Sequence, residues 1–169
     1  MFVLGVDPGL TRCGFGVVER TGGSLRAVAA GVLVTPSDDP LPTRLAELQV
    51  GIRSVLAEHR PAAVAVERVF FQSNLRTAMS VGQASGVVLA EAAAAGCVVA
   101  QYTPSQVKAS VTGSGTADKG QVQRMVQALL GLVALPRPAD AADALALAIC
   151  HHAAGPLSAR VEAAGARRR

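Results

Sequence analysis

Short, largely apolar runs alternate along this chain with longer segments in which apolar residues recur every three or four positions. The runs FVLGV, AVAVE and CVVAQY, at residues 2–6, 63–67 and 97–102, have strand length and predict strands buried on both faces. Residues 14–20 and 25–34 predict two more strands, and the turn TGGS between them predicts a hairpin. The first three of these five strands are therefore expected to be antiparallel neighbours.

The segments between the later strands predict helices. One is marked by apolar residues at helical spacing and ends near Pro61: Leu45, Leu48, Ile52, Val55 and Leu56. A second helix, expected over residues 74–95, has small residues three or four positions apart: Ala78, Gly82, Ser85, Gly86, Ala90 and Ala93. Small side chains on this helix favour close packing, either against a second subunit or against the protein's own sheet.

Three further helices follow the fifth strand. Thr103 with Gln106, and Asp118 with Gln121, are residue pairs that form capping boxes at helix starts. The last helix is expected to begin at Asp140. Three strands in antiparallel order, followed by alternating helices and strands, describe an α/β protein with a five-stranded mixed sheet flanked by helices, which is the order of the ribonuclease H-like fold.

The chain of 169 residues fits a single domain, expected over residues 1–155. The segment 156–169 holds four of the sixteen Lys and Arg residues and is expected to be a basic, disordered tail. Because this segment carries most of the net positive charge, the rest of the chain is nearly neutral. If a cluster of acids in the domain binds cations, however, the remaining surface is basic. Such a surface favours a polyanionic partner.

Four acids lie at the ends of apolar elements: Asp7 and Glu67 close two strands, while Asp140 and Asp143 open the last helix. Each has an ordinary structural interpretation alone. Asp7 before Pro can start a turn, Glu67 can mark the point where a strand meets water, and Asp140 can cap its helix with Asp143 one turn later. Together they change this interpretation, because ligands of α/β proteins bind where strands end.

Four converging carboxylates repel one another, by about 1–4 kcal/mol for each close pair, so cations must relieve the charge. Carboxylate oxygens without His or Cys suit Mg²⁺ or Mn²⁺. Two such ions can stabilise the attacking and leaving oxygens of an in-line phosphoryl displacement. The pattern therefore predicts metal-dependent hydrolysis of a phosphodiester.

The segments LGVDPGLTRCGFGVV, AVERVFF, GQASGVVLA, QVKASVTGSGTADKGQVQRMV and ADAADALALAICH resemble the RuvC family of Holliday-junction resolvases over residues 2–152. The resemblance implies that the metal-binding catalytic acids are Asp7, Glu67, Asp140 and Asp143. It also implies two Mg²⁺ ions, replaceable by Mn²⁺, and a homodimer that nicks a four-way DNA junction symmetrically in recombination and repair. The ends would be 5′-phosphates and 3′-hydroxyls, and the branch-migration proteins RuvA and RuvB would be partners.

Four residues are candidates for contact with DNA, and the same resemblance supports the first three of them. Phe70 matches an aromatic that stacks on a base near the junction centre, Lys108 and Lys119 match lysines near the scissile phosphate, and Arg76 is a candidate for a backbone phosphate. The alternatives are a core position for Phe70 and solvated surface positions for the lysines. His151 and His152, two turns beyond Asp143, are expected at the surface or at the helix end.

More than one function is compatible with the residues alone. Asp7-Pro-Gly-Leu-Thr11 also fits the phosphate loop of actin-like and sugar-kinase ATPases, although those proteins close two such domains on a nucleotide. A different ribonuclease H-like nuclease and a junction-binding module without catalysis fit the residues too. Three widely spaced cysteines predict neither disulfides nor a zinc site. The absence of an apolar run of membrane length, and of a signal peptide, predicts a cytoplasmic protein.

Overall fold

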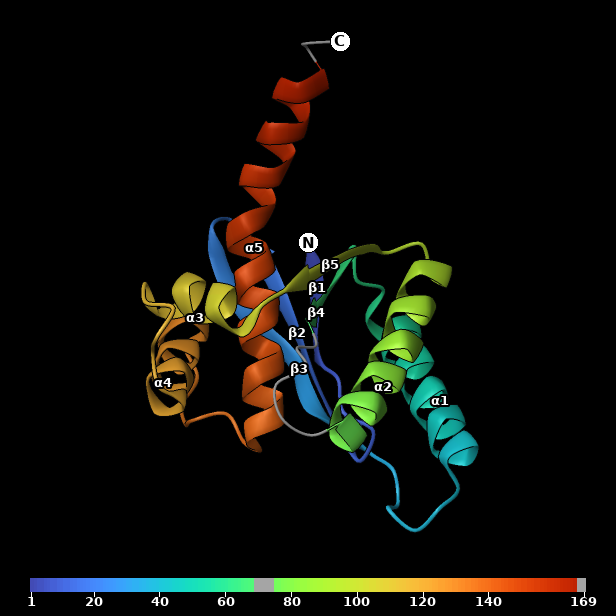
Figure 1. Cartoon of the computed structure of the whole chain (residues 1–169). Coiled ribbons are helices and arrows are strands. Elements are labelled where there is room, and N and C mark those ends of the chain that lie inside the picture. Colours follow the sequence, from blue (N-terminus) through green and yellow to red (C-terminus); the bar gives the residue numbers. More distant parts are fainter. Residues whose placement is uncertain (69–74, 167–169) are drawn as a thin grey trace.

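The computed structural model describes residues 1–68 and 75–166, of which 75–77 and 155–166 are described as backbone only. The elements follow in the order β1 (Phe2–Asp7), β2 (Arg12–Thr21), β3 (Ser24–Val34), α1 (Leu41–His59), β4 (Ala63–Glu67), α2 (Leu75–Ala94), β5 (Val98–Tyr102), α3 (Pro104–Thr112), α4 (Lys119–Leu130) and α5 (Ala139–Ala166) (Figure 1).

The five strands form one mixed sheet in the order β3-β2-β1-β4-β5. The first three strands are antiparallel neighbours, and β1, β4 and β5 run parallel. Gly22 and Gly23 connect β2 to β3 with φ angles of 59° and 92°, which glycine adopts without strain in a two-residue hairpin. The predicted fold class, the antiparallel pairing of the first three strands and the hairpin are therefore confirmed.

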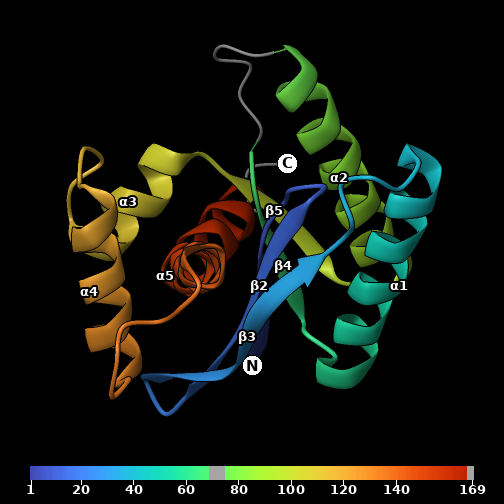
Figure 2. The same ribbon diagram turned by 90° about the horizontal axis from the view of Figure 1, so that it is seen from below.

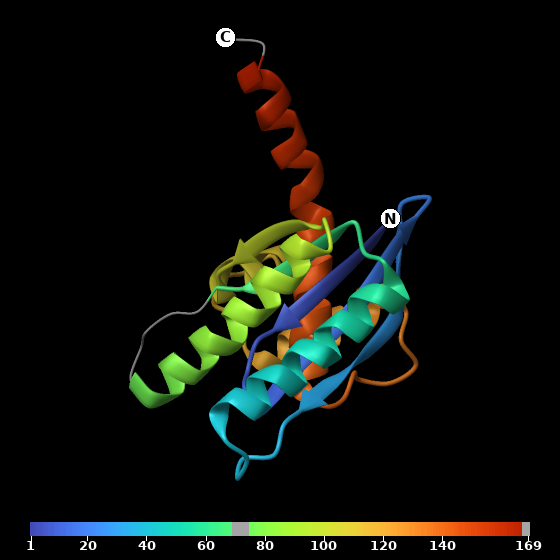
Figure 3. The same cartoon turned by 90° about the vertical axis from the view of Figure 1, so that its right-hand side faces the viewer.

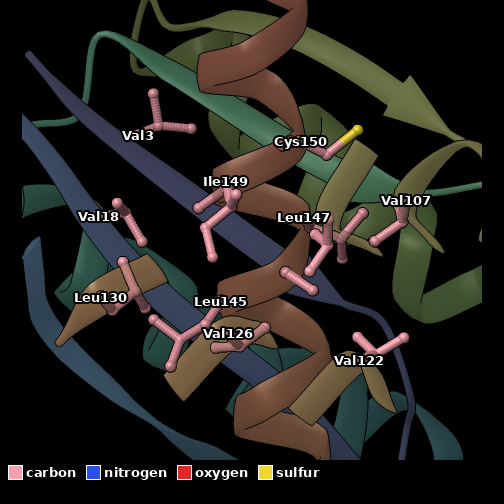
Figure 4. Packing of buried hydrophobic residues seen from close by; sticks show 14 of the residues in the cluster. Val3, Val18, Val107, Val122, Val126, Leu130, Leu145, Leu147, Ile149 and Cys150 are labelled. Carbon is pink, nitrogen blue, oxygen red and sulfur yellow. The ribbon is translucent and has the colours of Figure 1, made fainter. Parts of the chain in front are cut away.

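Helices cover both faces of the sheet (Figures 2 and 3). On one face lie α1 and α2, and on the other α5 lies against the strands with α3 and α4 outside it. Each face has its own apolar core. Leu4, Val6 and Val64 pack with α1 and α2, whereas Val3 and Val18 pack with α5. Figure 4 shows this second core, in which side chains of α4 and α5 interdigitate beside the strands.

A row of glycines brings α5 unusually close to the sheet. Gly5 of β1 is opposite Gly16 of β2, and Gly14 is opposite Asp7. A Cβ atom added at Gly5 would clash with the main-chain oxygen of Ala144, and one at Gly14 would clash with the main-chain oxygen of Asp140. Only glycine leaves room for the helix backbone here, so these residues fix the depth at which α5 sits.

The starts of α3 and α4 confirm the predicted capping boxes at Thr103 and Asp118. The last helix was predicted correctly, but its expected first residue was wrong by one position. The helix begins at Ala139, and the main-chain oxygen of Pro138 accepts from the amides of Ala141 and Ala142, so Asp140 lies in the first turn and does not cap it. Its carboxylate is thereby free for contacts across the molecule.

The expectation that His152 is a surface residue was also wrong. Its side chain is buried, with 1% exposed, and its Nε2 atom donates to the main-chain oxygen of Val18 at 3.0 Å. His151 is half-buried, and its Nδ1 atom lies 2.9 Å from the hydroxyl of Tyr102. These two bonds attach the middle of α5 to β2 and β5.

Beyond His152, α5 continues to Ala166 and extends past the sheet (Figure 1). The helix therefore includes most of the segment that was expected from its composition to be a disordered tail. The division into a domain over residues 1–155 and a tail stays a prediction. No helix within the described residues is long and apolar enough to cross a membrane.

Candidate active site

The carboxyl ends of β1 and β4 and the first turn of α5 meet at one edge of the sheet, in the lower half of Figure 1. Asp7 is the last residue of β1, Glu67 is the last of β4, and the two strands are hydrogen-bonded neighbours. The close approach at Gly14 brings Asp140 over this edge. Asp143 follows one turn later on the same helix face.

Asp7 and Glu67 form a carboxyl pair with a hydrogen bond between their side chains. Such a bond requires a proton on one of the two groups. Burial, and then the charge and hydrogen bond of Asp7, raise the pKa of Glu67 to about 7. Burial and the negative charge of Asp143 likewise raise the pKa of Asp7. Burial therefore favours one shared proton on this pair over two ionised carboxylates.

The two acids of α5 are each paired with a side-chain cation instead. Arg12, the first residue of β2, places Nε 2.9 Å and Nη2 2.8 Å from the same oxygen of Asp140, Oδ2. Lys119, the first residue of α4, places Nζ 2.8 Å from Oδ2 of Asp143. The hydrogen bond to Asp143 raises the pKa of Lys119, which stays charged.

The loop that follows Asp7 is anchored to the start of α1. The hydroxyl of Thr35, which is buried, donates to the main-chain oxygen of Leu10 at 2.6 Å. Arg44 of α1 donates to the hydroxyls of Thr35 and Thr11, at 3.0 and 2.7 Å. These bonds fix the backbone just after Asp7, so its carboxylate sits on a rigid turn.

The chemistry of this donor set fits a divalent metal centre. Four carboxylates gather without His or Cys, and a divalent cation would stabilise the ionised forms of Asp7 and Glu67, whose pKa is raised by burial and by neighbouring acids. The four carboxylates do not yet point to a common position. Within residues 1–68 and 75–166, no group of three or more His, Cys, Asp or Glu side chains is arranged to hold an ion. Asp140 and Asp143 are turned to Arg12 and Lys119.

The structure brings five predicted site residues to this edge or near it and leaves two undescribed. Lys119 contacts Asp143 directly. Lys108 is half-buried in α3, and its side chain has no hydrogen bond or ion pair to the acids within the described part of the chain. Phe70 lies outside the described residues, as does the side chain of Arg76.

Sequence reasoning missed Arg12. It stands 128 positions from Asp140 along the chain, and an arginine at the start of a strand is an ordinary surface residue. The glycine row was missed as well, although a signal was available. Gly5, Gly14 and Gly16 interrupt strands of high β-propensity, and glycine within a strand often marks a close backbone approach.

The small-residue helix α2 has two different faces. Ala84, Ser85 and Val88 are buried, and Val88 packs in the core beside α1. A second face, here called the outer face of α2, is exposed and consists of Met79, Gly82, Gln83, Gly86, Ala90 and Ala93. A Cβ added at Gly82 or Gly86 meets nothing within 4 Å. The two glycines therefore leave room on this face for another backbone.

Comparison with known proteins identifies relatives over the whole length of the chain. The family described as "Crossover junction endodeoxyribonuclease RuvC" matches residues 3–151. The protein of that name from Salinispora arenicola is 56% identical over 170 residues, which span 100% of this chain and 97% of the relative.

Solved structures agree with the sequence match. The structure described as "T. thermophilus RuvC in complex with Holliday junction substrate" superposes with a TM-score of 0.89 at 40% identity, over 94% of this chain and 96% of that one. The yeast mitochondrial Holliday junction resolvase Ydc2 superposes with a TM-score of 0.64 at 16% identity, over 89% of this chain and 78% of that one, and shows a shared fold.

Proposed function

Because the chain belongs to the RuvC family of crossover junction endodeoxyribonucleases, we propose that it resolves four-way (Holliday) DNA junctions at a metal centre formed by Asp7, Glu67, Asp140 and Asp143. The observation that carries this assignment is the convergence of Asp7 and Glu67, at the ends of two neighbouring strands, with the two acids at the start of α5. Burial, together with the negative charge of neighbouring acids, raises the pKa of Asp7 and Glu67, and a divalent cation would stabilise their ionised forms. The family is metal-dependent, and the oxygen-only donor set favours Mg²⁺, with Mn²⁺ as a substitute.

Two ions bound to these acids would stabilise the attacking and the leaving oxygens of the phosphodiester during an in-line displacement. The chain's own residues supply the remaining parts. Lys119 carries a positive charge beside Asp143, where it can also attract a phosphate oxygen. The glycine row and the loop held by Thr35 fix the positions of the acids of β1 and α5 relative to each other.

The other DNA contacts rest on the family resemblance for Phe70 and Lys108, and on a position beside Ser73 and Asn74 in the sequence for Arg76. We assign Phe70 to stacking on a base at the junction centre, Lys108 to a phosphate near the cut, and Arg76 to the DNA backbone. The products would be 5′-phosphate and 3′-hydroxyl ends that ligase can join, which suits recombination and repair.

A homodimer is supported by the outer face of α2, whose glycines leave space for a second backbone. A two-fold dimer would place one active site on each of two equivalent strands of the junction. The family resemblance also suggests RuvA and RuvB as partners. Cytoplasmic action is supported by three free cysteines, Cys13, Cys97 and Cys150.

The test is cleavage of a synthetic four-way junction with a mobile centre, beside linear duplex and an RNA–DNA hybrid, in Mg²⁺ or Mn²⁺. Wild-type protein should make paired symmetric nicks in the junction alone. Asp7→Asn should bind the junction normally and cut at least about a thousandfold more slowly, because a ligand of the centre is lost. Asp38→Asn, an exposed acid before α1, is the matched control and should cut at the wild-type rate. Cleavage by Asp7→Asn at the wild-type rate would exclude the proposed centre.

A further inference from the structure

Arg12 is a cation placed against the candidate metal centre. Its guanidinium contacts Asp140 through two nitrogens, at 2.9 and 2.8 Å, and both bind the same oxygen, Oδ2. The arginine side chain is 48% exposed and that of Asp140 is 31% exposed, so both partners can move without unfolding the site. An ion pair of this exposure is weak and exchangeable.

The charges of the four acids are balanced in three different ways in the absence of a metal. Asp7 and Glu67 share a hydrogen bond that requires a proton. Asp143 is paired with Lys119, and Asp140 is paired with Arg12. A divalent ion that binds Asp140 must compete with the guanidinium of Arg12 for the same carboxylate. The two cations also repel each other at this distance.

We propose that Arg12 is a positioning residue that occupies Asp140 until DNA arrives, so that divalent metal and DNA bind this site cooperatively. The phosphodiester to be cut must lie beside the four acids, and its neighbouring phosphates attract an arginine that is held only by an exposed pair. When Arg12 turns to a phosphate, Asp140 is released to the metal. DNA binding therefore raises the affinity for metal, and metal binding raises the affinity for DNA by the same factor.

This inference rests on the proposed function of the four acids. It also makes a separate prediction, namely whether the loss of Arg12 raises or lowers the affinity for metal. Loss of a supporting residue ordinarily weakens a metal site, by about tenfold or more. Loss of a competing cation strengthens it. The Arg12→Gln variant thus distinguishes competition from structural support by the sign of the effect.

The experiment measures Mn²⁺ binding directly, by electron paramagnetic resonance of free Mn²⁺, with all four acids present. Without DNA, Arg12→Gln should bind Mn²⁺ about three- to tenfold more tightly than the wild-type protein. Adding a four-way junction whose central phosphodiesters are replaced by non-hydrolysable linkages, which prevents cutting, should tighten Mn²⁺ binding to the wild-type protein and change the binding to Arg12→Gln by a clearly smaller factor. Arg26→Gln is the matched control, because Arg26 forms a 2.8 Å pair with Glu19 away from the acids. It should leave Mn²⁺ affinity unchanged.

The outcomes distinguish the role of Arg12 from the metal centre itself. Weaker or equal Mn²⁺ binding by Arg12→Gln overturns the role of Arg12 and leaves the proposed metal centre standing. The wild-type protein, titrated with Mn²⁺ both without DNA and with the uncut junction, checks that centre. If it binds no Mn²⁺, the proposed function and the role of Arg12 both fail.

Discussion

Gly14 and Asp140 are in contact through the backbone of α5: a Cβ atom at position 14 would overlap the main-chain oxygen of Asp140. Because Gly14 is also opposite Asp7 in the β1–β2 ladder, this one contact joins two of the four acids. Because Gly14 has no side chain, α5 can approach the sheet closely, and this approach sets the separation between the acids of the strands and the acids of the helix.

Gly14→Ala tests this relationship. The added methyl group must push α5 away from the sheet, which should cost about 1–3 kcal/mol of unfolding free energy and weaken Mn²⁺ binding. Urea denaturation with a parallel Mn²⁺ titration would measure both effects. Gly115→Ala is the matched control, since a Cβ there makes only an ordinary 3.4 Å contact with Ser105. Equal stability of the two variants would contradict the role assigned to Gly14.

Metal affinity should depend on pH through the pair Asp7–Glu67. Burial and the nearby charge of Asp7 raise the pKa of Glu67 to about 7. Below pH 7 its carboxyl is mostly protonated, and a metal ion must displace that proton, so the apparent affinity should fall as pH falls, by up to about tenfold per unit for one proton. Calorimetry at pH 6 in two buffers of different ionisation enthalpy should detect proton release on Mn²⁺ binding. The release should decline by pH 8.5, and its absence at pH 6 would contradict the shared proton.

The stability of the fold should depend on pH through His152 as well. Burial lowers the pKa of His152 in the folded protein, while the unfolded chain keeps the ordinary value near 6.5. Below pH 6.5 the unfolded chain therefore binds more protons at this position, and the contribution of His152 to stability is lost as pH falls. His152→Gln should reduce the dependence of unfolding free energy on pH between 7 and 5, measured in urea at each pH. It should also cost about 1–3 kcal/mol at pH 7, where the bond to Val18 is disturbed. An unchanged pH dependence would show that His152 does not contribute to it.

The outer face of α2 gives a test of the homodimer. Gly86→Leu adds a side chain where the subunit itself has nothing within 4 Å, so the fold should be retained and a second backbone excluded. Light scattering after size exclusion should show a dimer for wild type and a monomer for this variant. Ala46→Leu, on an exposed position of α1, is the control and should remain dimeric. A dimeric Gly86→Leu protein would place the interface elsewhere.

The sheet order and the meeting of the four acids could be predicted because apolar runs define strands, and the ends of parallel strands share an edge. The surroundings of side chains that contact distant segments of the chain could not be predicted. Arg12 and Asp140 are linked only after β2 and α5 are docked, and His152 is buried only because β2 offers it the oxygen of Val18. The role of Asp140 stayed open between a helix cap and a metal ligand, because an acid at a helix start has the chemistry of both, and the structure pairs it with Arg12.

The order of the acids along the chain has a consequence for protein synthesis. Asp7 and Glu67 leave the ribosome early, but Asp140 and Asp143 belong to α5, the last element, and α5 must dock on the glycine row before they meet the strand acids. A nascent chain that has already folded its sheet still lacks half of the centre. A product truncated before α5 would therefore lack two of the four acids of the proposed centre, and we expect it not to cut DNA.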